Sequence, residues 1–291
     1  MNTQLWKGII NFVALDKYPK LPCPYCNQVE LTIDQQSVQT RKISQNYERS
    51  ATSRHYQAVI QKKESELEKS EQQLNKVIEH SALMGILLGI GQIALEAYRP
   101  EYHFHKFIAF MSCKSCGDSV SINGLAQVDL SDNSNKPPSP TLFKVEHFST
   151  TIPFFEIDKQ VPLKVQLELL GAFHYFHIDT NSSASKLRRA IEHFCKELGA
   201  ETDNLNNNIQ ALAKSYPLES ELLHTLRLVG NEGTHADGVN EDDLLTAFEI
   251  FKEVLSVFRK REILAELKNS QKVLNDKFKK EKKKEMKQIT P

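Results

Sequence analysis

The sequence lacks an excess of charge and a hydrophobic run of membrane length, and each shortage excludes a class of protein. Lysine plus arginine and aspartate plus glutamate are equal at 37 each in 291 residues, so no overall field attracts nucleic acid or an acidic partner. The longest apolar stretch, residues 82–97, is shorter than the ~20 residues that a bilayer-spanning helix needs. We therefore expect no membrane contact.

An apolar leader segment is also missing from the start of the chain. Residues 1–12 are interrupted by Asn2, Gln4, Lys7 and Asn11, which do not fit the hydrophobic region of a secretory signal. We expect a cytoplasmic protein, in which thiols stay reduced. Paired cysteines in that compartment indicate metal binding rather than disulfides.

Cysteine is scarce, but its placement is informative. Four of the five cysteines form two Cys-x-x-Cys pairs, Cys23 with Cys26 and Cys113 with Cys116. Two such pairs supply the four thiolates of a tetrahedral structural zinc site. The fifth, Cys195, lies among apolar residues of an expected helix and is predicted to be buried and unreactive.

The two pairs are separated by residues 27–112, far more than the usual spacing of about 15–20 residues. Strand-like patterns surround them at residues 29–33, 105–111 and 119–122. The sequence therefore predicts a zinc ribbon split by an insertion, with ribbon segments 1–44 and 103–130.

The insertion has the composition of a helical hairpin. Residues 45–79 contain no proline or glycine, and Ile60, Leu67 and Leu74 follow one another at intervals of seven, as in a coiled coil. An apolar helix then returns the chain. We expect a helical arm over residues 45–102 that either binds another copy or a partner, or folds back over its own protein.

The second half of the chain follows a linker and is predicted to be mostly helical. Residues 131–141 are rich in serine, asparagine and proline, a composition typical of linkers. An extended stretch around 143–157 precedes expected helices at 161–176, 184–198, 219–229 and from about 241 to at least 267. Residues 181–185 are expected to cap the second helix, Gly199 to end it and Asn240 to cap the last.

Residues 266–291 form a predicted basic helical tail. Nine lysines and three acids lie between Lys268 and Lys287. The tail either contacts nucleic-acid phosphates without sequence preference or is a frayed, solvated terminus.

Arg227, Asn231 and His235 are spaced four residues apart and share one face if the segment is helical. A guanidinium, an amide and an imidazole together can hold a phosphate and move a proton during RNA cleavage. The alternative is a helix end, where Gly230 breaks the turn and Asn231 and His235 cap carbonyls. Spacing alone favours this second interpretation.

A second charged group precedes it in the sequence. Arg188 and Glu192 can pair along a helix, since they are four residues apart. Arg188 or its neighbour Arg189 can face the interior and brace Asn231 or His235. The alternative is a solvated ion pair that contributes little.

Taken in order, these segments resemble a known family. Residues 152–153, 161–162, 185–192 and 226–235, followed by a long apolar helix, resemble the domain of unknown function DUF4145 over residues 142–258. The resemblance implies a helical module of bacterial proteins associated with restriction or anti-phage defence. Cys-x-x-Cys pairs upstream, as here, are common in such proteins.

That family is similar to the HEPN superfamily, whose helical bundles dimerise and cut RNA without a metal. Its signature places an arginine directly before an asparagine. Here Gly230 stands in the arginine position before Asn231. A transition-state oxyanion needs a positioned cation, which only Arg227, Arg188 or Arg189 can supply.

We therefore expect an α+β, mainly α protein: a split zinc ribbon with an inserted helical hairpin, then a HEPN-like helical domain over residues 142–265. The departure at Gly230 favours a non-catalytic, defence-associated module that binds RNA, DNA or a partner protein, as a dimer or larger oligomer. The alternative is a metal-independent endoribonuclease with His235 as acid and base, Arg227 as phosphate clamp and Asn231 as orienting amide. In both, zinc is structural.

Overall fold

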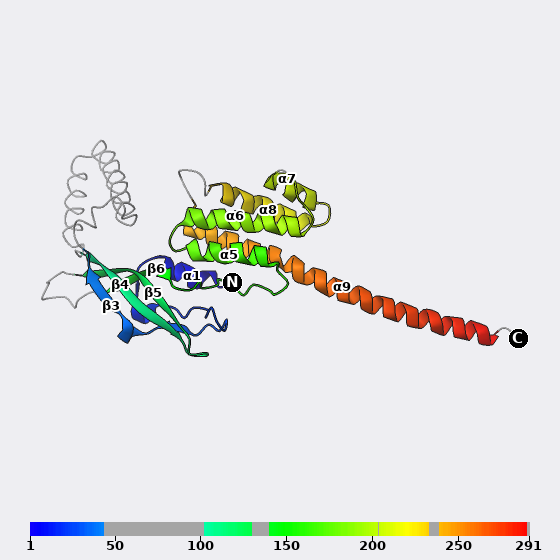
Figure 1. The fold of residues 1–291 in the computed structure, drawn as a ribbon, viewed down its shortest axis with the longest axis horizontal. Helices are drawn as coiled ribbons and strands as arrows, with labels where there is room; N and C mark the ends of the chain where they lie inside the picture. Colours follow the sequence, from blue (N-terminus) through cyan, green and yellow to red (C-terminus); the bar gives the residue numbers. More distant parts are fainter. Residues whose placement is uncertain (44–101, 130–139, 203, 233–238, 290–291) are drawn as a thin grey trace, which may run out of the picture.

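The computed structural model describes residues 1–43, 102–129, 140–202, 204–232 and 239–289. Almost all of the expected arm at 45–102 and most of the linker at 131–141 lie outside the described residues. The described part is a mixed α and β structure, in which an antiparallel sheet lies on one side of a group of helices (Figure 1).

Six described strands form one sheet in the order β1-β6-β5-β4-β2, and β3 pairs with another stretch of β4. All the pairs are antiparallel. The strands are β1 (Val13–Ala14), β2 (Leu31–Ile33), β3 (Gln39–Lys42), β4 (Tyr102–Cys113), β5 (Ser119–Asp129) and β6 (Leu142–Phe148). Short 3₁₀ turns, η1 (Leu15–Lys17) and η2 (Gln35–Ser37), lie before β2 and after it.

Strands β4 and β5 form because their side chains alternate between a buried and a solvent-facing side. Phe107, Ala109 and Met111 are buried, whereas Ile108 and Phe110 between them are exposed. This period of two is the pattern of a strand with one covered face. The strands predicted around both cysteine pairs are therefore confirmed.

Strand β6 belongs to the same sheet. It pairs with β5 from Gln127 opposite Leu142 to Ile122 opposite Phe148. Gly124 lies at a register shift, and a Cβ at that position would come within 2.1 Å of the Lys144 carbonyl oxygen. We expected a domain boundary at residue 142. That residue begins β6, a strand that hydrogen-bonds to β5.

Six helices make up the rest of the described fold. They are α1 (Thr3–Ile10), α5 (Leu163–Tyr175), α6 (Thr180–Glu197), α7 (Leu205–Leu212), α8 (Pro217–Glu232) and α9 (Glu241–Ile289). The four expected helices are confirmed as α5, α6, α8 and α9, whereas α1 and α7 were not expected. None of the helices in the described ranges is long and apolar enough to cross a membrane.

The helix ends follow local chemistry. Asp179 caps α6 by accepting from the backbone N–H groups of Asn181 and Ser182, which places the cap just before the range predicted for it. Gly199, with φ of +89°, follows the end of α6, and the Asn240 side chain accepts from the N–H of Asp243 in α9. Both of these caps were predicted.

One aromatic cluster joins the sheet side to the helices. Phe154 has ring centroids 4.1 Å from Trp6 of α1, 4.9 Å from Phe173 of α5 and 5.2 Å from Phe248 of α9. These side chains belong to a single hydrophobic core that also includes β4 and β5. The two parts of the described chain therefore share buried surface.

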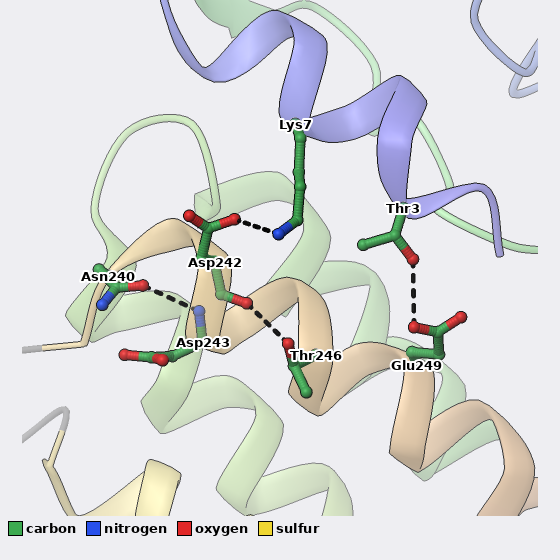
Figure 2. A network of polar contacts seen from close by, with 7 residues as sticks. All are labelled: Thr3, Lys7, Asn240, Asp242, Asp243, Thr246 and Glu249. Carbon is green, nitrogen blue, oxygen red and sulfur yellow. Dashed lines mark hydrogen bonds and ion pairs between the residues drawn. The ribbon is translucent and has the colours of Figure 1, made fainter.

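Polar contacts reinforce the junction of the first and last helices (Figure 2). Lys7 of α1 lies 2.8 Å from the Asp242 carboxylate, and the Thr3 hydroxyl donates to Glu249 at 3.1 Å. Asp242 and Glu249 both lie on α9. Helix α1 is thus fixed along the first turns of α9.

Candidate functional site

The two cysteine pairs form knuckles with the same backbone geometry. In the first, the N–H of Asn27 donates to the Cys23 carbonyl at 2.9 Å, and Asn27 has φ of +59°. In the second, Gly117 donates to Cys113 at 3.0 Å, with φ of +80°. The residue after each pair is therefore in the left-handed region, which glycine and asparagine adopt most readily.

Strand pairing brings the two knuckles together. Leu31, just after the first knuckle, is opposite Cys113 of β4, and the N–H of Lys114 donates to the Glu30 carbonyl at 3.1 Å. The residues between the knuckles in sequence do not separate them in space. The long separation of the two cysteine pairs in the sequence is thus compatible with a single metal site formed by all four cysteines.

The four sulfurs form one compact cluster. All four Sγ atoms lie within 4.8 Å of one another, and the Cys23–Cys116 and Cys26–Cys113 pairs are each 3.7 Å apart. A tetrahedral ion with metal–sulfur distances of about 2.3 Å separates its sulfurs by roughly 3.8 Å. All four thiols are free of disulfides. The cluster can therefore hold a metal ion.

Backbone amides favour the ionised form of one ligand. The N–H groups of Cys116 and Ser115 lower the pKa of the Cys113 thiol to about 7, although desolvation opposes them. Metals bind the thiolate rather than the thiol, so this turn is suited to a ligand. Cys23 and Cys113 are buried, whereas Cys116 is exposed.

The fifth cysteine lies apart from this cluster. Cys195 is buried in α6, and burial, together with the Glu192 carboxylate, raises its pKa to about 12. Its thiol stays protonated at neutral pH and is a poor nucleophile. The prediction that Cys195 is buried is confirmed, and its raised pKa agrees with the predicted low reactivity.

The arginine-bearing segments meet where α6 packs against α8. Gly230 of α8 is buried, and a Cβ there would lie 2.9 Å from the Cβ of Arg188 in α6. This distance is shorter than real Cβ contacts. Glycine is therefore required at residue 230 for the two helices to approach so closely.

Arg188 is held on both sides at this crossing. Its Nε donates to the Glu192 carboxylate at 3.2 Å, and its Nη1 donates to the side-chain oxygen of Asn231. Arg188, Glu192 and Asn231 thus form one hydrogen-bonded group, which we call the crossing cluster. The prediction that an arginine of α6 braces Asn231 is borne out by these contacts.

Arg189 lies elsewhere. Its Nη2 is 2.7 Å from the carboxylate of Glu168 in α5, and Lys186 is 3.1 Å from the other oxygen of the same group. Glu168 is only 12% exposed. Arg189 therefore ties α6 to α5 rather than supporting Asn231, and Glu168 was not predicted as its partner.

The other two members of the predicted triad are only partly described. Arg227 lies on α8, and its Nε is buried without a hydrogen-bond partner among the described residues. His235 lies outside the described residues. In the structure, Asn231 is hydrogen-bonded to Arg188 of α6. The spacing along α8 had instead grouped Asn231 with Arg227.

Comparison with protein families finds one match. Residues 171–287 match the family model described as a domain of unknown function, DUF4145. The matched segment runs from within α5 to the end region of α9 and includes the crossing cluster. The resemblance noted in the sequence is supported for this part of the chain. The chain matches no curated protein and no solved structure.

Proposed function

We propose that this chain is a non-catalytic module of a bacterial defence system, which binds nucleic acid or a partner protein and acts as an oligomer. The association with defence rests on the DUF4145 match of residues 171–287 and on the settings in which that family is found. The ribbon serves as its scaffold and the helical domain as the recognition part.

The observation that carries this proposal is the pairing of Arg188. Cleavage of a phosphodiester needs a cation free to stabilise the developing oxyanion. The guanidinium of Arg188 is already hydrogen-bonded to the Glu192 carboxylate and to Asn231, and Gly230 offers no side chain. These contacts favour a structural role for Arg188, in which it holds α6 and α8 together, over a role in stabilising a transition state.

A HEPN-type endoribonuclease is the second candidate, and one contact favours it. Arg188 supplies a guanidinium beside Asn231, in the region where Gly230 replaces the signature arginine. In this alternative, His235 transfers the proton, Arg227 binds the phosphate and Asn231 orients the substrate. Substrate would have to displace Glu192 from Arg188.

Incubation of the full chain with labelled RNA distinguishes the non-catalytic module from the endoribonuclease. We expect no cleavage by the wild type. Cleavage that disappears in His235→Ala but persists in His224→Ala, a control histidine on α8, would overturn the proposal. Circular dichroism of both variants controls for loss of folding.

We further propose that the ion held by Cys23, Cys26, Cys113 and Cys116 is zinc with a structural role. Four thiolates complete its tetrahedral shell, so no position is left for a reacting water. Elemental mass spectrometry of purified protein should find about one zinc per chain. Cys113→Ser should lose it, whereas Cys195→Ser should retain it. Equal zinc content in both variants would contradict this assignment.

Infection assays test the link to defence. Bacteria that carry the gene with its neighbours should form fewer phage plaques than bacteria that carry the same region without residues 171–287. Equal plaque counts over a panel of phages would argue against a defence role, whatever the biochemical activity of the protein.

A further inference from the structure

Helix α9 extends well beyond the group of helices (Figure 1). We call its part from Arg259 onward the arm, which is a different segment from the hairpin predicted at 45–102. Phe258 is its last buried residue, and the described side chains from Arg259 onward are exposed. This arm nevertheless carries large apolar side chains. Ile263, Leu267, Leu274 and Phe278, which we call the arm row, are 45%, 58%, 54% and 57% exposed.

The arm row lies away from most of the core face of α9, although the buried Leu245 has the same helical angle as Ile263. Each residue turns a helix by about 100°, so the row lies roughly 130° around the axis from the side that carries Leu244, Phe248 and Phe251. Acidic residues, among them Glu262, continue the core side along the arm. The row therefore does not serve the packing of its own domain.

The spacing of the arm row is symmetric about its midpoint. Its residues follow at intervals of four, seven and four. A two-fold axis between Ser270 and Gln271 would thus place Ile263 opposite Phe278 of a second copy, and Leu267 opposite Leu274. An interface between identical chains requires such reciprocity, in which residue i meets j and j meets i.

Charges beside the row agree with the antiparallel direction. Glu266 and Lys277 lie along the same edge of the row, by the same helical rotation. Antiparallel pairing brings Glu266 of one copy close to Lys277 of the other, twice. Parallel pairing would leave them eleven residues apart, or about 16 Å along the axis. Opposite charges next to an apolar seam select direction and partner.

Three other basic residues of the arm lie away from this pairing. Arg261, Lys268 and Lys272 lie on the side of the arm away from the seam and are exposed, where salt screens them. The row also begins five residues after Phe258, about 7 Å beyond the buried part of α9. This distance gives a second helix access to the row.

We propose that the arm row is the interface between two copies of this chain, paired antiparallel about a two-fold axis at Ser270 and Gln271. The inference rests on the oligomeric state proposed above and adds the surface and the geometry. The two helical domains then lie at opposite ends of a shared pair of arms. A row of about 22 Å is short for a permanent dimer, so the association is reversible.

Sedimentation equilibrium of the full chain tests the surface. We expect a monomer–dimer equilibrium that Leu267→Asp weakens by at least about tenfold, because a carboxylate replaces a buried leucine at two symmetric places. Ala265→Asp is the matched control, since Ala265 is exposed on the same arm and lies on the side opposite the row and its charged edge. It should leave the dimer unchanged.

Charge reversal tests the direction. Glu266→Lys and Lys277→Glu should each weaken the dimer, and the double variant should restore it. Failure of the double variant to restore the dimer would overturn the antiparallel geometry. Glu266 and Lys277 are both exposed, so folding is preserved and is checked by thermal melting.

The outcomes separate this inference from the oligomeric state itself. A dimer that persists in Leu267→Asp would overturn the arm interface and leave oligomerisation standing. A wild type that is monomeric at every concentration would overturn both. If that monomer binds phosphatidylserine vesicles and Leu267→Asp does not, the row belongs to a membrane surface instead.

Discussion

Single residues decide how closely the helices of this protein approach one another. Gly230 permits the crossing of α6 and α8, and Arg188 and Asn231 bond across it. The sequence showed that Gly230 departs from the HEPN signature, but its steric role depends on a neighbouring helix. A residue that looks like the loss of a catalytic arginine is thus also a packing requirement.

Gly230→Ala should destabilise the protein by about 1–3 kcal/mol, because the added methyl group meets Arg188 and forces the helices apart. Urea unfolding measures the change. Gly8→Ala in α1 is the control, since a Cβ there meets nothing within 4 Å, and it should be neutral or stabilise by about 0.5–1 kcal/mol. Equal effects of the two substitutions would show that the crossing is looser than described.

His177 gives the protein a pH dependence at its aromatic centre. Its ring lies 4.9 Å from Phe176 and 5.2 Å from Phe148, and its Nε2 is buried without a partner in the described chain. Burial, with the nearby charge of Lys144, lowers its pKa from 6.5 to about 3. Protonation therefore favours the unfolded state.

The sign of this effect can be measured. The contribution of a neutral His177 is complete above about pH 6.5 and falls as the pH falls toward 3, by about 1.4 kcal/mol per pH unit. His177→Phe should remove that slope between about pH 6.5 and 5.5 in urea unfolding experiments. Parallel stability profiles of wild type and variant would contradict the assignment.

At the scale of elements, helix α6 is held to its neighbours by charge as well as by apolar packing. Glu168 of α5 accepts from both Lys186 and Arg189 of α6. The carboxylate is nearly buried, so its two partners depend on it. By contrast, the pair of Lys196 and Glu201 at the other end of α6 is exposed.

Glu168→Gln should therefore cost about 1–3 kcal/mol, because it leaves two cations with a neutral partner in a nearly buried place. Glu201→Gln is the matched control and should cost less than about 1 kcal/mol, as exposed ion pairs do. Thermal unfolding of both variants in low and high salt provides the comparison. A larger effect of the exposed pair would contradict this ranking.

Elements with a long regular pattern were predictable from the sequence, and those defined by distant partners were not. Helices α5, α6, α8 and α9 follow from apolar periodicity and cap residues, and β4 and β5 from alternation. The pairing of β6 with β5 joins residues on either side of the linker, and composition does not reveal such a pairing. Helix α7 is short and rich in asparagine, which weakens its periodic signal.

The sites divide in the same way. The four cysteines were predictable because metal chemistry demands a fixed ligand number and spacing. The bond between Arg188 and Asn231 was only one of several options, since the sequence does not tell which arginine of α6 faces α8. Glu168 was missed because a single glutamate on a helix is usually a solvated side chain.

At the scale of the whole molecule, the metal centre joins segments from before and after the interval at 44–101. Cys23 and Cys26 precede it, and Cys113 and Cys116 follow it. An ion held by these four cysteines would close a long loop in the chain and fix the end of β4 against β2. The helical domain draws its stability from the aromatic core instead.

Removal of the metal with a chelator should loosen the sheet and leave the helices folded. We expect faster hydrogen exchange in β2 and in the ends of β4 and β5 near the knuckles, with protection retained in α5, α6 and α8. The loss should be on the order of several kcal/mol, since metal binding free energy is folding free energy. Uniform loss of protection would instead show that sheet and helices unfold as one unit.

The contact between α1 and α9 has a consequence for the order of events during synthesis. Thr3 is synthesised before its partner Glu249, which follows 246 residues later. By then the four cysteines and all the strands are available to fold, since domains form as the chain emerges. Trp6 reaches its final surroundings beside Phe154 and Phe248 only after the beginning of α9 has been made. Helix α1 is therefore synthesised well before α9, the helix that completes its surroundings.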